Sequence, residues 1–200
     1  MDYKLVSAVL TRDEGRSGEP YLDSNGIPTV GIGRNLKDVG IHTNELKIIV
    51  PKLVNADFHS VFKERAGCRY INGNYRGGSV RFDSIESYRG VVGRKPLSNT
   101  DMDMLLQGDI RIALAGCLDV FGEDWSQFPE HVRDVFVQVV FNLGEGTFGE
   151  FKKCIAAARD GDYGKAGDEL VDSDAARETG ERYARYKAVL ATGDTAWYKL

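Results

Sequence analysis

The feature that most restricts the fold of this chain is an Asn25-Gly26 step between two short β-prone runs. Asn-Gly is the strongest local signal for a tight antiparallel turn, because both residue types tolerate a positive φ. We therefore predict a small antiparallel hairpin over residues 21–33. An apolar stripe with helical spacing predicts a helix over residues 2–12, directly before the hairpin, and Gly15 is suited to end that helix.

Helical periodicity dominates the rest of the chain. Thr100, with Asp103 three residues later, resembles a capping arrangement that opens a long helix. The run 132–141 is apolar on nearly every side, which is typical of a helix at the centre of a lobe. An Asn72-Gly73 step suggests a second hairpin. The predicted helices after the first hairpin cover residues 44–65, 98–121, 132–141, 148–159, 163–171 and 181–191.

These elements predict one mainly helical α+β domain with two lobes. The N-terminal lobe, residues 13–97, holds the small antiparallel sheet. A connecting helix over residues 98–121 leads to a helical C-terminal lobe, residues 122–200, which the first helix joins. The segment at about 63–96 has no clear periodicity.

Composition argues against several classes of function. A formal net charge of −4 over 200 residues is unlike a general nucleic-acid or membrane-surface binder, which usually carries a basic excess. The three cysteines are widely spaced, which indicates free thiols of a reducing compartment, although a single disulfide stays open. Residues 1–11 do not have the pattern of a signal peptide, and no apolar run is long enough to cross a membrane. We therefore expect synthesis in a cytoplasm.

Three polar residues around the predicted hairpin suggest a catalytic site. Glu14 follows the first helix, Asp23 stands at the turn, and Thr29 lies on the returning strand. Glycosidic bond hydrolysis needs one carboxylic acid to protonate the leaving oxygen and a second carboxylate to activate water or attack. The spacing of Glu14 and Asp23 can place two carboxylates on opposite sides of a sugar, and the Thr29 hydroxyl can help to hold the water.

The same residues carry a family resemblance. Glu14-Gly15, Tyr21-x-Asp23, Gly26 and Thr29-Val30-Gly31-Ile32-Gly33 together resemble the phage-type lysozyme family, best known from the T-even bacteriophages. The family pattern is Glu, eight residues, Asp, five residues, Thr-x-Gly-x-Gly, and this sequence fits it without a gap. Further similar segments are residues 97–118, 132–133, 141–145 and 151–193, together with Trp197.

The resemblance implies a muramidase that cuts peptidoglycan glycan strands between N-acetylmuramic acid and N-acetylglucosamine with inversion. It assigns Glu14 as the general acid, Asp23 as the opposite carboxylate and Thr29 as the residue that positions water. It implies no cofactor, no metal and no nucleic-acid partner, and we expect a monomer without membrane insertion. Delivery to the wall would be by a holin or in a virion. The residues that it adds as candidates for substrate binding are Asn35, Phe141, Asn142 and Arg182.

The sequence departs from the family pattern at several places. Arg34 stands where the best-known member has a histidine, and the aspartate that pairs with that histidine aligns with Asp109, so we expect an Arg34–Asp109 pair. Cys154 and Glu169 replace serine and asparagine at positions that line the cleft. Relative to the family, the chain has an inserted segment at about 63–96, which carries five more positive than negative side chains over residues 63–95. Cations and aromatic rings suit peptide carboxylates and sugar faces, so we expect this segment to extend wall binding or simply to cap its lobe. Its residues in this hypothesis are Arg69, Tyr70, Tyr75, Arg76, Arg81, Phe82, Tyr88 and Arg89.

Other functions fit the sequence less well. Gly31-Ile32-Gly33 lacks the further glycine and the Lys-Ser/Thr pair of a phosphate loop. The three histidines, His42, His59 and His131, have no metal-ligand spacing. The alternatives that stay open are a lytic transglycosylase, which uses a glutamate without the water-holding pair, and a catalytically silent peptidoglycan-binding virion protein. A nucleic-acid module would rest on the inserted segment alone.

Overall fold

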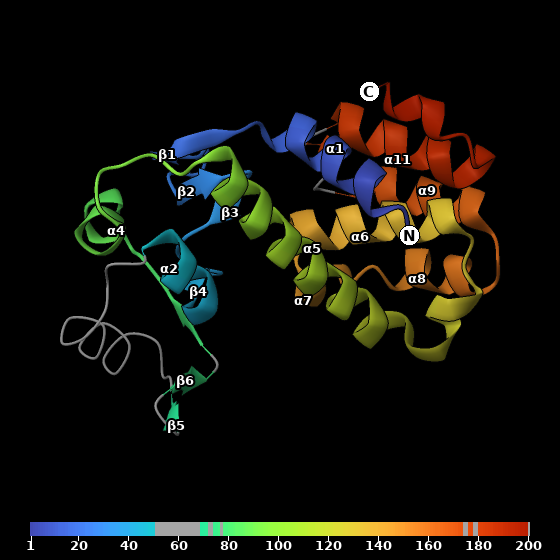
Figure 1. Cartoon of the computed structure of the whole chain (residues 1–200). Coiled ribbons are helices and arrows are strands. Elements are labelled where there is room, and N and C mark those ends of the chain that lie inside the picture. Colours follow the sequence, from blue (N-terminus) through green and yellow to red (C-terminus); the bar gives the residue numbers. More distant parts are fainter. Residues whose placement is uncertain (51–68, 72–73, 77, 174–175, 178–179, 200) are drawn as a thin grey trace. The chain divides into compact units, whose positions relative to one another are not determined.

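The computed structural model describes residues 1–50, 69–71, 74–76, 78–173, 176–177 and 180–199. It is mainly helical with small antiparallel sheets, which confirms the predicted α+β class in its coarse form (Figure 1). The chain divides into two compact units. We call Met1–Asp13 with Gly108–Leu200 the helical unit and Glu14–Gln107 the sheet unit.

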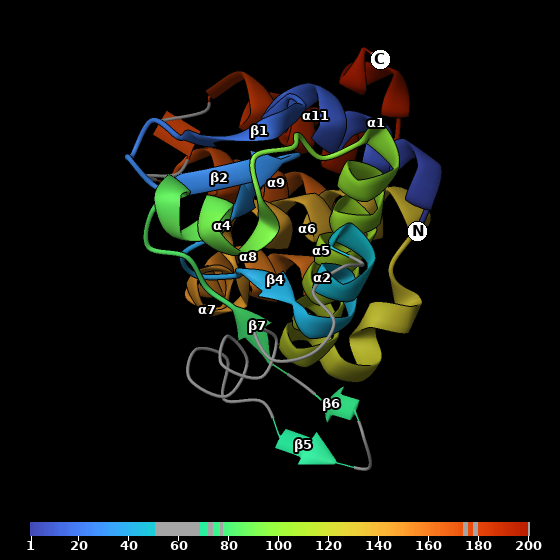
Figure 2. The same cartoon turned by 60° about the vertical axis from the view of Figure 1, so that its left-hand side comes forward.

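The sheet unit is built on the predicted hairpin. Strand β1 (Ser17–Leu22) pairs antiparallel with β2 (Pro28–Gly31) (Figure 2), and β2 pairs antiparallel with β3 (Arg34–Asn35), in the order β1-β2-β3 (Figure 1). In the β1–β2 loop, the Asp23 carboxylate accepts hydrogen bonds from the backbone amides of Asn25 and Ile27 at 2.9 and 2.8 Å. Gly26 has a φ of 73°, which is the left-handed conformation that the Asn-Gly signal implies. The third strand is only two residues long, too short for a period-2 pattern to predict.

Two further strand pairs belong to the same unit. Strand β4 (Ile41–His42) pairs with β7 (Ser79–Val80), and β5 (Arg69–Ile71) pairs with β6 (Asn74–Arg76), both antiparallel. The second pair confirms the hairpin predicted from Asn72-Gly73.

Two helices of the sheet unit differ from the prediction. Helix α2 covers Thr43–Ile49, so it accounts for the start of the helix predicted over residues 44–65, and residues 51–68 lie outside the described part of the chain. Helix α4 (Ile85–Val92) was not predicted. Its cap is Ser84, whose side chain accepts a hydrogen bond from the Ser87 amide at 3.1 Å. A serine cap of this kind stabilises the start of a short helix.

A buried ion pair fixes the segment between β3 and α2. Arg34 is 2% exposed, and its Nη2 lies 3.0 Å from Glu45 Oε2, while its Nε donates to the Gly40 carbonyl at 2.8 Å. The same Glu45 oxygen accepts the His42 amide at 2.9 Å. Glu45 is thus a partner of Arg34 that was not foreseen. The expected partner, Asp109, belongs to the helical unit, and that pairing stays a prediction.

Two long helices pass from one unit into the other. Helix α1 (Tyr3–Glu14) and helix α5 (Asn99–Phe121) each have residues in both. The cap of α5 was predicted two residues too late. Ser98 forms it, with its hydroxyl and amide both bonded to the Asp101 carboxylate at 2.7 and 3.0 Å, rather than Thr100 with Asp103. Both pairs have the same spacing, so sequence alone could not separate them.

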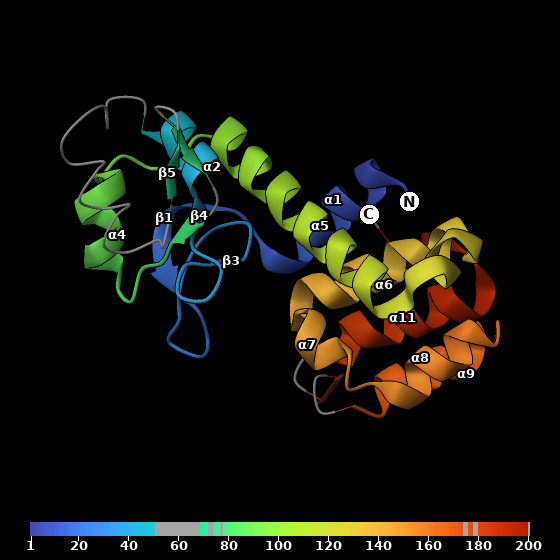
Figure 3. The same ribbon diagram turned by 90° about the horizontal axis from the view of Figure 1, so that it is seen from below.

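Seven further elements of the helical unit lie within the described residues. They are η1 (Gly122–Gln127), α6 (Glu130–Leu143), α7 (Glu145–Phe148), α8 (Lys152–Arg159), α9 (Tyr163–Val171), α11 (Gly180–Thr192) and η2 (Thr195–Tyr198). Helix α6 packs against α7 and α11, and α9 packs against α8 and α11 (Figure 3). Among the described residues, no helix is both long and apolar enough to span a membrane.

The core of the helical unit forms around α6, as its apolar sequence predicts. Phe136 of α6 lies 4.9 Å from Phe121 and 5.6 Å from Phe148, measured between ring centroids. All three rings are at most 1% exposed. Cys117 and Cys154 are buried free thiols, in agreement with the expectation for these two cysteines. Cys68 lies outside the described residues.

One carboxyl group is buried in this core. Asp134 of α6 is 1% exposed, and its Oδ1 accepts the Asp2 amide at 2.9 Å. Burial raises the pKa of Asp134 from its ordinary value of 3.8 to about 6, although the Asp2 hydrogen bond and the N-terminal ammonium act in the opposite direction. The folded state therefore binds this proton more tightly than the unfolded state does.

That difference predicts a pH effect on stability. The contribution of the Asp134 carboxyl group to the free energy of unfolding is complete below about pH 4. It is lost as the pH rises through about 6, because ionising a buried carboxyl group is costly. Asp134→Asn keeps the acceptor for Asp2 and cannot ionise. We expect its free energy of unfolding, measured in urea, to exceed that of the wild type at pH 7 and to lack the wild-type decline between pH 4 and 7. The exposed Asp119→Asn variant should follow the wild type, and parallel curves for all three proteins would contradict the assignment.

Candidate active site

Glu14 is placed by the end of α1 and by a close approach to the sheet. Gly15, with a φ of 72°, ends the helix directly after it. A Cβ added at Gly33 would lie 2.8 Å from Glu14 Oε2 and 2.9 Å from Glu14 Cγ. The Glu14 side chain therefore rests on the backbone of Gly33, between β2 and β3, at a point where only glycine leaves room.

A row of polar side chains crosses the three-stranded sheet beside this contact. Tyr21 is the direct partner of Thr29, and Thr29 is the direct partner of Asn35. Direct partners in an antiparallel pair have their side chains on the same face. Thr29 is 3% exposed, and its hydroxyl donates to the Ile27 carbonyl at 3.0 Å, so its orientation is fixed.

Both predicted carboxylates act electrostatically on Tyr21. Asp23 follows β1 two residues after Tyr21, and its Oδ1 is held by the loop amides described above. Burial raises the pKa of Tyr21, and the negative charges of Glu14 and Asp23 raise it further. Both carboxylates are thus close enough to act on the same phenol, which keeps its proton and can donate a hydrogen bond. Tyr21 belongs to the sequence motif, but sequence reasoning gave it no role.

The remaining candidate of the sheet unit, Asn35, is engaged in its own turn. Its Nδ2 donates to Asp38 Oδ2 at 2.8 Å, and its Oδ1 accepts the amides of Lys37 and Asp38 at 2.9 and 2.8 Å. These contacts give Asn35 a structural function at the exit of β3. Its predicted part in substrate binding stays a prediction.

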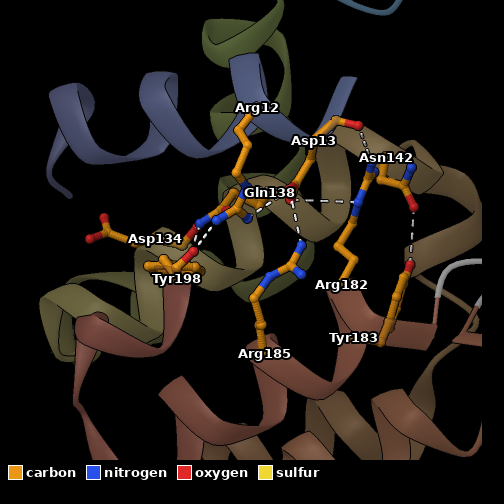
Figure 4. Close-up of polar contacts among 9 residues, drawn as sticks. All are labelled: Arg12, Asp13, Asp134, Gln138, Asn142, Arg182, Tyr183, Arg185 and Tyr198. Carbon is orange, nitrogen blue, oxygen red and sulfur yellow. Dashed lines mark hydrogen bonds and ion pairs between the residues drawn. The ribbon is translucent and has the colours of Figure 1, made fainter. Parts of the chain in front are cut away.

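Three candidates belong to the helical unit. Phe141 at the end of α6 is half-buried, and Asn142 is exposed, with its Oδ1 accepting from the Tyr183 hydroxyl at 3.2 Å (Figure 4). Arg182 of α11 contacts Asp13, the residue before Glu14, with its Nε 3.6 Å from Asp13 Oδ2. The predicted contact of Arg182 with Glu14 itself, and the part of all three residues in substrate binding, stay predictions.

The inserted segment is described only in part. Phe82 and Tyr88 are 0% and 1% exposed and pack edge to face at 5.4 Å between ring centroids. These two rings are core residues, so the expectation that they face sugars is wrong. In a segment without periodicity, the sequence does not reveal whether an aromatic side chain is buried or exposed.

Two of the departures from the family pattern line one pocket of the helical unit. Cys154 and Glu169 border a cavity of about 410 Å³, whose other lining residues are Glu150, Phe151, Lys152 and Lys153. Burial raises the pKa of the Cys154 thiol to about 12, and the charge of Glu169 adds to the effect. The thiol therefore stays protonated and is unsuited to nucleophilic attack. Within the described ranges, no cluster of three or more His, Cys, Asp or Glu side chains could hold a metal ion.

Comparison with known proteins does not identify a family: the sequence matches no protein-family model and no curated protein. A functional assignment therefore depends on the motif and on the geometry around Glu14.

The contact between Glu14 and Gly33 can be tested by stability. Gly33→Ala and Gly26→Ala both place a side chain at a positive φ, of 68° and 73°, and each should lose about 1–2 kcal/mol for that reason. Only the Cβ at position 33 meets another group, since nothing lies within 4 Å of a Cβ at Gly26. We expect Gly33→Ala to lose a further ~1–3 kcal/mol from overpacking.

Adding Glu14→Ala to the Gly33→Ala variant should recover part of that further loss, because it removes Cγ and the carboxyl group from the crowded position. Urea titrations give the free energies of unfolding of the wild type, the two glycine variants and this double variant. Equal losses for the two glycine variants would exclude the close approach.

Proposed function

We propose that this protein is a lysozyme, an inverting N-acetylmuramidase that hydrolyses the β-1,4 bond between N-acetylmuramic acid and N-acetylglucosamine in bacterial peptidoglycan. The observation that carries the proposal is that Glu14 and Asp23 both act on Tyr21, with Thr29 directly opposite Tyr21 on the next strand. Hydrolysis with inversion requires two carboxyl groups, and a neighbouring hydroxyl can help to hold the attacking water.

In the proposed mechanism, Glu14 donates its proton to the glycosidic oxygen as the bond to the anomeric carbon breaks. A water attacks that carbon from the opposite face and passes a proton to Asp23. The Asp23 carboxylate suits this part, since its Oδ1 is fixed by two loop amides and, among the hydrogen bonds of the described residues, none goes to Oδ2. The Thr29 hydroxyl donates to Ile27, so its lone pairs can accept a hydrogen bond from the same water.

The proposal extends to the other expectations from the family resemblance. The sheet unit and the helical unit would be the two lobes of a lysozyme-like fold, and Asn35, Phe141, Asn142 and Arg182 would contribute to glycan binding. The enzyme would act as a monomer on the cell wall, after release by a holin or from a virion.

The first test is removal of the acid. Glu14→Gln keeps the size of the side chain but cannot supply a proton, so we expect hydrolysis of purified sacculi to fall by about 10²–10⁴-fold with the fold retained. The matched control is Glu19→Gln, an exposed glutamate of β1 that contacts Arg89 at 3.4 Å, which should keep wild-type activity. A Glu14→Gln variant that retains more than about a tenth of the wild-type rate would reject Glu14 as the acid.

The second test is the chemistry of the product. Hydrolysis with inversion of a β-linked strand predicts an α-anomer as the first-formed reducing end, which NMR can observe before mutarotation. A first-formed β-anomer would contradict inversion. A 1,6-anhydro end would instead indicate a lytic transglycosylase. Binding to sacculi without loss of turbidity would indicate the catalytically silent wall-binding protein.

A further inference from the structure

The last turn of α1 carries a carboxylate that is surrounded by guanidinium groups (Figure 4). The side chain of Asp13 is 5% exposed. Its Oδ1 lies 2.6 Å from Arg12 Nη2 and 3.0 Å from Arg185 Nη2, and its Oδ2 lies 3.6 Å from Arg182 Nε. One nearly buried negative charge therefore has three positive partners.

These contacts tie the main chain as well as the side chain. Arg182 Nη2 donates to the Asp13 carbonyl oxygen at 3.1 Å. Arg182 and Arg185 are three residues apart on α11, so they project from one side of that helix. Arg12 also donates to the carbonyl of Tyr198 in η2. The end of α1 is thus fixed at two successive residues, to α11 and to η2.

Docking of α1 as a whole does not require this ion cluster. The apolar side of the helix, formed by Val6, Val9 and Leu10, is fully buried. Gathering three arginines at one carboxylate costs desolvation free energy, and apolar residues of similar size commonly stabilise as well or better. The cluster acts instead on the last turn, where helices fray because their final carbonyl groups lack partners within the helix.

Glu14 is the next residue and the last of α1, and Gly15 then leaves the helical conformation. On the basis of the proposed function, we propose that Asp13, held by Arg182 and Arg185, is a positioning residue that fixes the backbone from which the Glu14 carboxyl group projects. Asp13 takes no proton in the reaction. It restricts the position of the acid, for which a displacement of about 1 Å can lower the rate by about 100-fold.

Asp13→Asn tests this assignment, because it keeps the shape of the side chain and removes the charge that gathers the arginines. On a soluble glycan oligomer, at a temperature well below the midpoint of unfolding, we expect kcat to fall by about 10–100-fold and KM to change less than about 2-fold. The matched control is Asp168→Asn, which breaks an exposed ion pair between α9 and α11, Lys187–Asp168 at 2.6 Å, and should leave kcat unchanged.

A second measurement does not depend on activity. Native-state hydrogen exchange of the amides at the end of α1 should accelerate in Asp13→Asn, while the amides at the centre of α6 keep their wild-type protection. Arg185→Gln should lower kcat in the same way. The double variant should lose no more than the worse single variant, because both changes remove one interaction. If Asp13→Asn does not fold, the Arg185→Gln measurements test the assignment alone.

The outcomes separate this inference from the proposed function. A wild-type protein that does not cleave sacculi would reject the proposed function. An active wild type with unchanged kcat and unchanged exchange at the end of α1 in the folded variants would reject the positioning role alone. A decrease in stability with no change in kcat would also reject it, because it would show that the ion cluster only holds the fold together.

Discussion

The antiparallel register of β1 with β2 is the constraint on which the candidate site depends. Pairing of Tyr21 with Thr29 puts a phenol and a hydroxyl side by side on one face and leaves Asp23 in the loop that follows β1. A shift of one residue would send every strand side chain to the opposite face. The loop prevents that shift, since two backbone amides bind Asp23 and Gly26 takes a positive φ. The turn that closes the hairpin therefore also orients the carboxylate.

Buried and half-buried arginines secure the chain on both sides of this hairpin. Before it, Arg182 and Arg185 bind Asp13 at the end of α1. After it, Arg34 binds Glu45 and the Gly40 carbonyl. Guanidinium groups suit both places, because they stay charged and donate several hydrogen bonds in a fixed plane. Ion pairs and hydrogen bonds of this kind hold a side chain in one orientation, whereas apolar packing does not. A catalytic acid has to be held in one orientation relative to its substrate.

The sequence predicted those elements whose signal is local. Asn25-Gly26 located the hairpin, and the continuous apolar run located α6 at the core of the helical unit. The cap of α5 was misplaced because Ser98 and Thr100 offer the same spacing to an aspartate. Glu45 as a partner of Arg34 and the arginine partners of Asp13 were missed for a different reason. Ion pairs join side chains that are distant in the sequence, and periodicity holds no information about which charges meet. Phe82 and Tyr88 illustrate the same limit for aromatic residues, since burial depends on packing and not on residue type.

Two adjacent acidic residues at the end of α1 are held by different kinds of contact. The Asp13 carboxylate is held through its charge, by the guanidinium groups of Arg182 and Arg185 from α11 and by that of its neighbour Arg12. The Glu14 side chain is held in addition by a close steric contact, because a Cβ at Gly33 would come within 2.8 Å of its Oε2. An ion cluster fixes the end of the helix, and a glycine on the facing sheet leaves room for the next side chain. Asp13 therefore suits the part of an anchor, and Glu14 is the residue that the sheet admits beside Tyr21.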